Sequence, residues 1–70
     1  MNLTPEKFHA IVLRIREKRE VLHYTQAYVA KKMNISQNAY SKIEAGVTNF
    51  SIEKLYLIAE ILQADIKDFL

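Results

Sequence analysis

The sequence has no cysteine and only one glycine, one proline and two histidines. Without cysteine, neither a disulfide framework nor a thiolate metal site can form. Two histidines without a carboxylate cluster make a poor zinc site, so we expect no metal and no cofactor. The scarcity of glycine and proline argues against sheets joined by tight turns. What remains is a helical chain that must be held together by its apolar core.

Longer-range signals are also missing. No apolar run approaches the roughly 18 residues of a membrane span, so no membrane association is expected. Residues 1–8 are polar, and arginines crowd the apolar stretch that follows. The sequence therefore predicts no secretory signal, and the default expectation is a cytoplasmic protein. No phosphate loop and no nucleophile–base–orienter set is visible, so we do not expect an enzyme.

Length and charge bound the remaining possibilities. Seventy residues form one domain, residues 1–70, and a chain of this size buries only about 60% of its unfolded surface. Residues 1–50 carry eight Lys or Arg against four Asp or Glu, whereas residues 51–70 carry two against four. This asymmetry permits a polyanion-binding face in the first fifty residues without proving one.

Apolar residues recur at helical spacing, and each apolar stretch follows a residue that can cap a helix N-terminus. In chain order the five capping residues are Thr4, Thr25, Ser36, Ser51 and Asp65. His23, Asn34 and Gly46 stand where helices should end, and each tolerates a left-handed conformation better than most residues. Residues 47–50 should form a loop, and Ile52 should open the inner stripe of the fourth helix. The sequence therefore predicts an all-α, compact five-helix bundle, in which the fifth helix is short.

Only Asn34 and Ile35 separate the second expected helix from the third, which forces a large angle between them. The spacing predicts a helix-turn-helix over about residues 25–46. Tyr40 and Ile43 face inward on its second helix. The outer face then consists of Gln37, Asn38, Ser41, Lys42 and Ala45.

These outer side chains suit the edges of DNA bases. Gln37 and Asn38 can donate and accept together, which matches adenine in the major groove. Lys42 could donate to guanine or contact a phosphate. The alternative is a simple solvated helix face.

Further residues could contact the DNA backbone. Ser36 opens the third helix, whose N-terminus favours phosphates. Tyr28 is expected to be exposed and could reach a phosphate. Thr48 and Asn49 follow the third helix, and a phosphate contact or a plain loop would explain them equally well.

The segment from about residue 51 to 70 carries more apolar residues than one core stripe needs. A surplus of this kind suggests self-association, although it could also complete the core of a very small domain. The expected homodimer interface consists of Tyr56, Leu57, Ile61, Ile66, Phe69 and Leu70.

The chain resembles the helix-turn-helix domains of the phage repressor and Cro type, the XRE family. Residues 24–26, 29–37 and 40–46 carry the resemblance, and residues 51–55 and 58–59 also match. The stretch from Ser36 to Gly46 is its most specific part. The family often has glycine where this chain has His23, Asn34 and Gln63.

The resemblance implies a five-helix domain that binds double-stranded DNA as a dimer and controls transcription. It implies base contacts from Gln37, Asn38, Ser41 and Lys42 and a DNA-backbone contact from Gln26. It also implies a structural pair between Arg19 and Glu44. We expect this pair to be partly buried; an exposed pair would be worth under about 1 kcal/mol.

We therefore expect a sequence-specific transcriptional regulator, a repressor that binds a palindromic operator as a homodimer. The alternative is a helical protein-interaction module or an antitoxin-type protein that binds a partner. Loss of operator affinity in Gln37→Ala and Asn38→Ala variants would favour the first interpretation.

Overall fold

A computed structural model describes residues 3–70 of the chain. These residues form four α-helices, α1 (Pro5–Val21), α2 (Gln26–Lys32), α3 (Gln37–Glu44) and α4 (Ile52–Ile61), followed by the short 3-10 helix η1 (Ile66–Asp68). The described residues contain no strand, so the all-helical prediction is confirmed.

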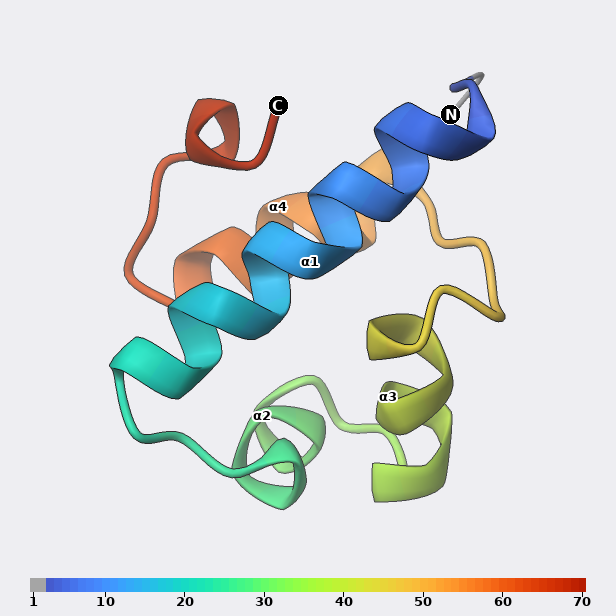
Figure 1. Cartoon of the computed structure of the whole chain (residues 1–70). Coiled ribbons are helices and arrows are strands. Elements are labelled where there is room, and N and C mark those ends of the chain that lie inside the picture. The colour runs from blue at the N-terminus through green and yellow to red at the C-terminus, as the bar shows by residue number, and fades with distance from the viewer. Residues whose placement is uncertain (1–2) are drawn as a thin grey trace.

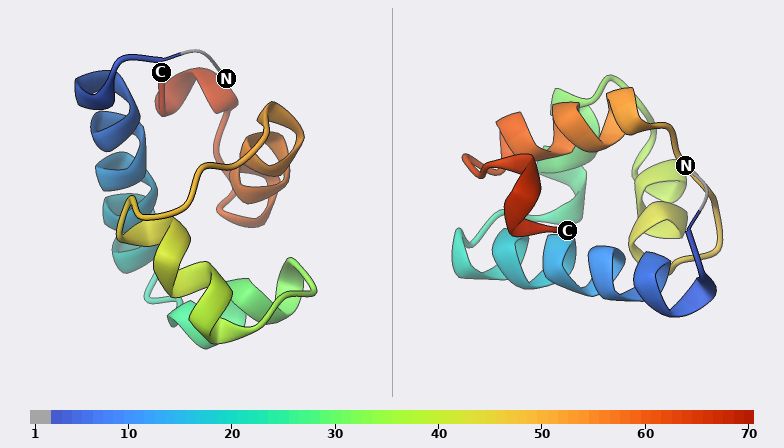
Figure 2. Two further views of the ribbon diagram at one scale, coloured as in Figure 1. Left: turned by 90° about the vertical axis from the view of Figure 1, so that its right-hand side faces the viewer. Right: turned by 90° about the horizontal axis from the view of Figure 1, so that it is seen from above.

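The helices surround one core (Figures 1 and 2). α1 and α4 run in roughly the same direction on two sides of the molecule, and η1 lies between them. α2 and α3 lie together at the opposite end from η1, joined by the short turn of the helix-turn-helix (Figure 1). Within residues 3–70, no helix is both long and apolar enough to cross a membrane.

Each α-helix begins with the side-chain cap expected from the sequence. Thr4, Thr25, Ser36 and Ser51 each accept a hydrogen bond from the backbone N–H three residues on, at 3.0–3.3 Å. These bonds satisfy N–H groups that a helix start would otherwise leave without a partner. Because each of these bonds joins residues only three apart, the local sequence is sufficient to define where all four α-helices begin.

Each α-helix also ends in the same way. The residue after each C-cap has a positive φ: 59° at His23, 61° at Asn34, 73° at Gly46 and 57° at Gln63. The next backbone N–H then donates back to a carbonyl five residues earlier, as from Ile35 to Ala30 at 3.0 Å. This is the Schellman arrangement, which satisfies carbonyls at the helix end. Gln63 adopts it despite its side chain, so α4 ends sharply.

The expected fifth α-helix is instead a single 3-10 turn. Its backbone bonds join residues only three apart, including Phe69 N–H to the Ile66 carbonyl at 3.0 Å. Asp65 and Asp68 form a capping box, and this closes the turn. Arg14 Nη1 then donates to the Phe69 carbonyl at 3.0 Å, which ties the turn to α1.

Two apolar positions lie elsewhere than the sequence pattern suggested. Phe50, expected in a loop, is buried and packs against Phe8 with ring centroids 5.5 Å apart. Ile52, expected on the inner stripe of α4, is 38% exposed because it lies in the first turn, beyond the edge of the core. The core is therefore completed by Phe50 in the loop before α4, and not by Ile52 in the first turn of the helix.

Candidate nucleic-acid interface

Helix α3 is fixed in place by its buried face. Tyr40 and Ile43 are 0% and 3% exposed, and they pack in the common core with α1 and α2. Glu44, the last residue of the helix, is 1% exposed and is the buried charged residue of the described chain. A helix held by three buried side chains presents its other face with little freedom to rotate.

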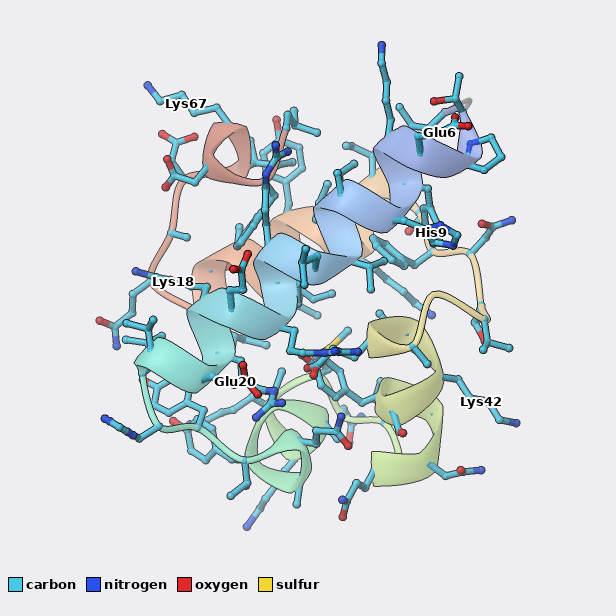
Figure 3. All side chains as sticks on the ribbon, viewed as in Figure 1. Glu6, His9, Lys18, Glu20, Lys42 and Lys67 are labelled. Carbon is cyan, nitrogen blue, oxygen red and sulfur yellow. The ribbon has the colours of Figure 1, made fainter. Side chains whose placement is uncertain are left out.

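That other face is polar. Gln37, Asn38 and Lys42 are exposed, and Ser41 is half-buried. Lys42 extends away from the body of the molecule (Figure 3). No hydrogen bond or ion pair within residues 3–70 engages the side chains of Gln37, Asn38 or Lys42. Their donors and acceptors therefore face solvent and can meet an incoming ligand.

Glu44 joins three helices through its carboxylate. Arg19 of α1 makes two hydrogen bonds to it, Nε to Oε2 at 2.7 Å and Nη2 to Oε1 at 2.9 Å. Gln26, the first residue of α2, donates from Nε2 to Oε1 at 3.3 Å. Arg19 also donates from Nη1 to the Tyr24 carbonyl at 2.8 Å, in the connection between α1 and α2. The bidentate geometry is the stronger form of arginine–carboxylate contact. The Arg19 side chain is 13% exposed, so the pair is largely withdrawn from water.

The contacts within the cluster of Arg19, Tyr40 and Glu44 shift the pKa values of all three residues. Burial raises the pKa of Glu44, but the hydrogen bonds from Arg19 and Gln26 and the positive charge of Arg19 outweigh it, so the pKa is lowered. The hydrogen bond to Glu44 raises the pKa of Arg19. Burial raises the pKa of Tyr40, and the neighbouring Glu44 carboxylate raises it further. The cluster is therefore an ion pair at neutral pH, beside a neutral tyrosine.

Arg16 approaches the same carboxylate and was not singled out by the sequence pattern. Its Nη2 donates to the Glu44 backbone carbonyl at 3.4 Å, and its Nε lies 3.8 Å from Glu44 Oε1. It precedes Arg19 by three residues, so both project from one side of α1. This i, i+3 spacing is the signal that could have identified it.

The expected backbone-contacting residues surround α3. Thr48 and Asn49 are exposed in the connection between α3 and α4, and Ser36 caps α3 while exposed to solvent. Gln26 is half-buried, with its amide held by Glu44. Tyr28 is 40% exposed, but its ring packs against Tyr24 at a centroid distance of 4.6 Å.

The expected dimer residues do not form one patch. Tyr56 and Leu57 are 58% and 37% exposed on α4, and Ile61 and Ile66 are half-buried against the core. Leu57 and Ile61 line a groove beside α2, whereas Leu70 lines a different hollow beside α1.

Phe69 corrects the sequence expectation. It is 2% exposed, because the η1 turn directs its ring into the core, and it cannot contribute to a surface between two copies.

Comparison with known proteins agrees with this geometry. The family model described as Helix-turn-helix matches residues 15–69, which include all four α-helices wholly or in part and η1. No curated protein and no solved structure matches the chain. The chain belongs to the helix-turn-helix family of the Cro and phage-repressor (XRE) type, whose members are DNA-binding transcription regulators.

Proposed function

We propose that this helix-turn-helix protein is a repressor that reads a palindromic operator as a homodimer, with α3 in the major groove. The observation that carries the proposal is the division of α3 into two faces. Tyr40, Ile43 and Glu44 fix one face in the core, while Gln37 and Asn38 on the other have free amides. A rigid helix with unpaired amide groups is suited to direct readout of base edges.

Base readout requires both the right chemistry and a fixed position. Gln37 and Asn38 lie in the first turn of α3, the part of a recognition helix that reaches base edges. Each amide can bind adenine N6 and N7 together, and each such contact is worth about 1–3 kcal/mol of discrimination. Ser41 and Lys42, one turn later, would contact a neighbouring base or phosphate.

Contacts on either side of α3 would set its register on the duplex. Gln26 and Ser36 stand at the starts of α2 and α3, and Thr48 and Asn49 follow α3. Polar side chains in such positions commonly bind phosphate oxygens and orient the reading helix. Tyr28 is a weaker candidate because its ring is committed to the contact with Tyr24.

The second copy would dock on α4. Tyr56 and Leu57 are the large apolar residues exposed along this helix beyond its first turn, and Ile61 extends the surface toward its end. A two-fold axis through this surface would bury apolar area on both copies at once. The two α3 helices would then enter successive major grooves about 34 Å apart.

Selection of DNA from a random pool with the purified full chain tests this function. We expect an inverted repeat, with half-sites centred about 10 base pairs apart. Gln37→Ala and Asn38→Ala should each lower affinity for that repeat by about 1–3 kcal/mol, while Lys67→Ala, a control on the exposed η1 turn, should not. Recovery of no preferred sequence would contradict the proposal and favour the protein-interaction alternative.

A further inference from the structure

Arg16 differs from Arg19, one turn later on α1, in how closely its guanidinium group is paired with a carboxylate. Arg19 forms a bidentate pair with Glu44 at 2.7 and 2.9 Å and is 13% exposed. Arg16 reaches the same residue only at 3.4 and 3.8 Å, and its side chain is 47% exposed. Arg19 therefore neutralises Glu44, and Arg16 adds a surplus positive charge.

The surplus charge has no other partner in the described chain. Within residues 3–70, Glu44 is the one carboxylate within 4.0 Å of the Arg16 guanidinium. The hydrogen bond to the Glu44 carbonyl uses one of the five guanidinium N–H groups. The side chain is thus oriented by the last turn of α3 and keeps most of its donors for another ligand.

The position of Arg16 indicates what that ligand is. Arg16 Nε and Gln26 Nε2 approach the same oxygen of Glu44, at 3.8 and 3.3 Å, so the two side chains are neighbours. Gln26 begins α2 and is a proposed contact to the DNA backbone. A duplex whose phosphate lies at Gln26 would bring that phosphate, or the next one, within reach of an exposed guanidinium. Arginine matches phosphate particularly well because its planar fork can donate two hydrogen bonds at once.

We propose that Arg16 binds a DNA phosphate, held in position by Glu44 at the carboxyl end of α3. This inference rests on the proposed function, because it assumes that the face formed by α2 and α3 meets DNA. It adds a cation to an interface on which Lys42 is otherwise the exposed basic residue of α3. Arg16 would also link the position of the bound duplex to the position of α3, since the same guanidinium group contacts both.

The test is a salt titration of binding to a labelled duplex of mixed sequence, about two helical turns long, which requires no known operator. Each phosphate contact contributes about 0.9 to the slope of log affinity against log salt. Arg16→Gln, which removes the charge and keeps a polar side chain, should lower the slope by about 0.9. The affinity advantage of the natural chain should then shrink about threefold to fourfold between about 50 and 200 mM salt. Arg16→Lys should keep the slope.

Lys67→Ala is the matched control, because it removes one positive charge from a side chain that is 80% exposed on η1. Lys67 and Lys42 lie on opposite sides of the molecule (Figure 3). We expect the control to keep the slope of the natural chain. Thermal unfolding of every variant separates binding from folding.

Three results would overturn the assignment. A lower melting temperature in Arg16→Gln with an unchanged slope would make Arg16 a structural cap alone. Equal slope losses in Arg16→Gln and Lys67→Ala would indicate a general charge effect. A natural chain without salt-dependent DNA binding would refute the proposed function, and the Arg16 assignment with it.

Discussion

Replacing Arg19 with alanine tests the contact that positions α3. The substitution removes two hydrogen bonds, at 2.7 and 2.9 Å, from a carboxylate that is 1% exposed. Gln26 at 3.3 Å and Arg16 at 3.8 Å would remain near it. Removing one partner of a buried ion pair typically costs about 3–5 kcal/mol. Since the remaining donors offset part of this cost, we expect a loss of about 3 kcal/mol in the free energy of unfolding.

A loss of this size is large for so small a domain. At about 0.05–0.15 kcal/mol per residue, the whole chain is stable by roughly 4–10 kcal/mol. For domains of this size, 1 kcal/mol corresponds to about 4–8 °C, so the melting temperature should fall by about 12–24 °C. Urea unfolding followed by circular dichroism measures the free energy directly. Lys67→Ala, which breaks the exposed pair between Lys67 and Asp65, should change it by under about 1 kcal/mol.

A double-mutant cycle with Glu44→Gln isolates the pair itself. Each single variant leaves one member of the pair without its partner, and the double variant removes both charges together. Residues in direct contact show coupling energies of about 0.5–3 kcal/mol, and we expect the upper part of this range. If Arg19→Ala lowers the free energy of unfolding by no more than Lys67→Ala does, the buried pair of Arg19 and Glu44 does not hold α3 in place.

Three further predictions concern stability. Gly46→Ala should cost about 1–2 kcal/mol, because its φ is +73° and a Cβ would lie 3.1 Å from His9 Cδ2; urea unfolding checks this. As the pH falls, the unfolded chain takes up a proton at Glu44 before the folded chain does, since folding lowers this pKa. The stability that this shift provides is present above the ordinary pKa of 4.5 and is lost as the pH falls through the folded value. The free energy of unfolding of Glu44→Gln, measured against pH, should therefore fall less steeply in acid than that of the natural chain. Phe69→Ala should cost about 3–5 kcal/mol, whereas Leu70→Ala, at a position 63% exposed, should change stability by under about 0.5 kcal/mol, and thermal unfolding of both variants separates core from surface.

The helix boundaries could be predicted because their causes are local. A capping side chain binds a backbone N–H three residues away, and a left-handed residue closes a helix on its own last turn. Asn34 illustrates this, since one residue type at one position ends α2 and sets the turn to α3. The exposed face of α3 followed for the same reason, because helical spacing fixes which residues lie opposite Tyr40 and Ile43.

Tertiary contacts were harder to predict from the sequence than helix boundaries. Apolar spacing could not show whether Phe69 covers the core or a partner, because both surfaces select the same residue type. Its burial depends on the η1 turn and on the bond from Arg14, 55 residues earlier in the chain. The proximity of Arg19 and Glu44 came only from the family resemblance. The i, i+3 spacing of Arg16 and Arg19 places both on one side of α1, but it identifies Arg16 only once the contact between Arg19 and Glu44 is known.

If the exposed face of α3 reads base sequence, the affinity of the protein must depend on that sequence. The most direct measurement is the ratio of affinities for the selected inverted repeat and for a duplex of scrambled sequence, both at physiological salt. We expect a ratio of about 10³ or more. A ratio near one would contradict it, because phosphate contacts alone bind every sequence equally.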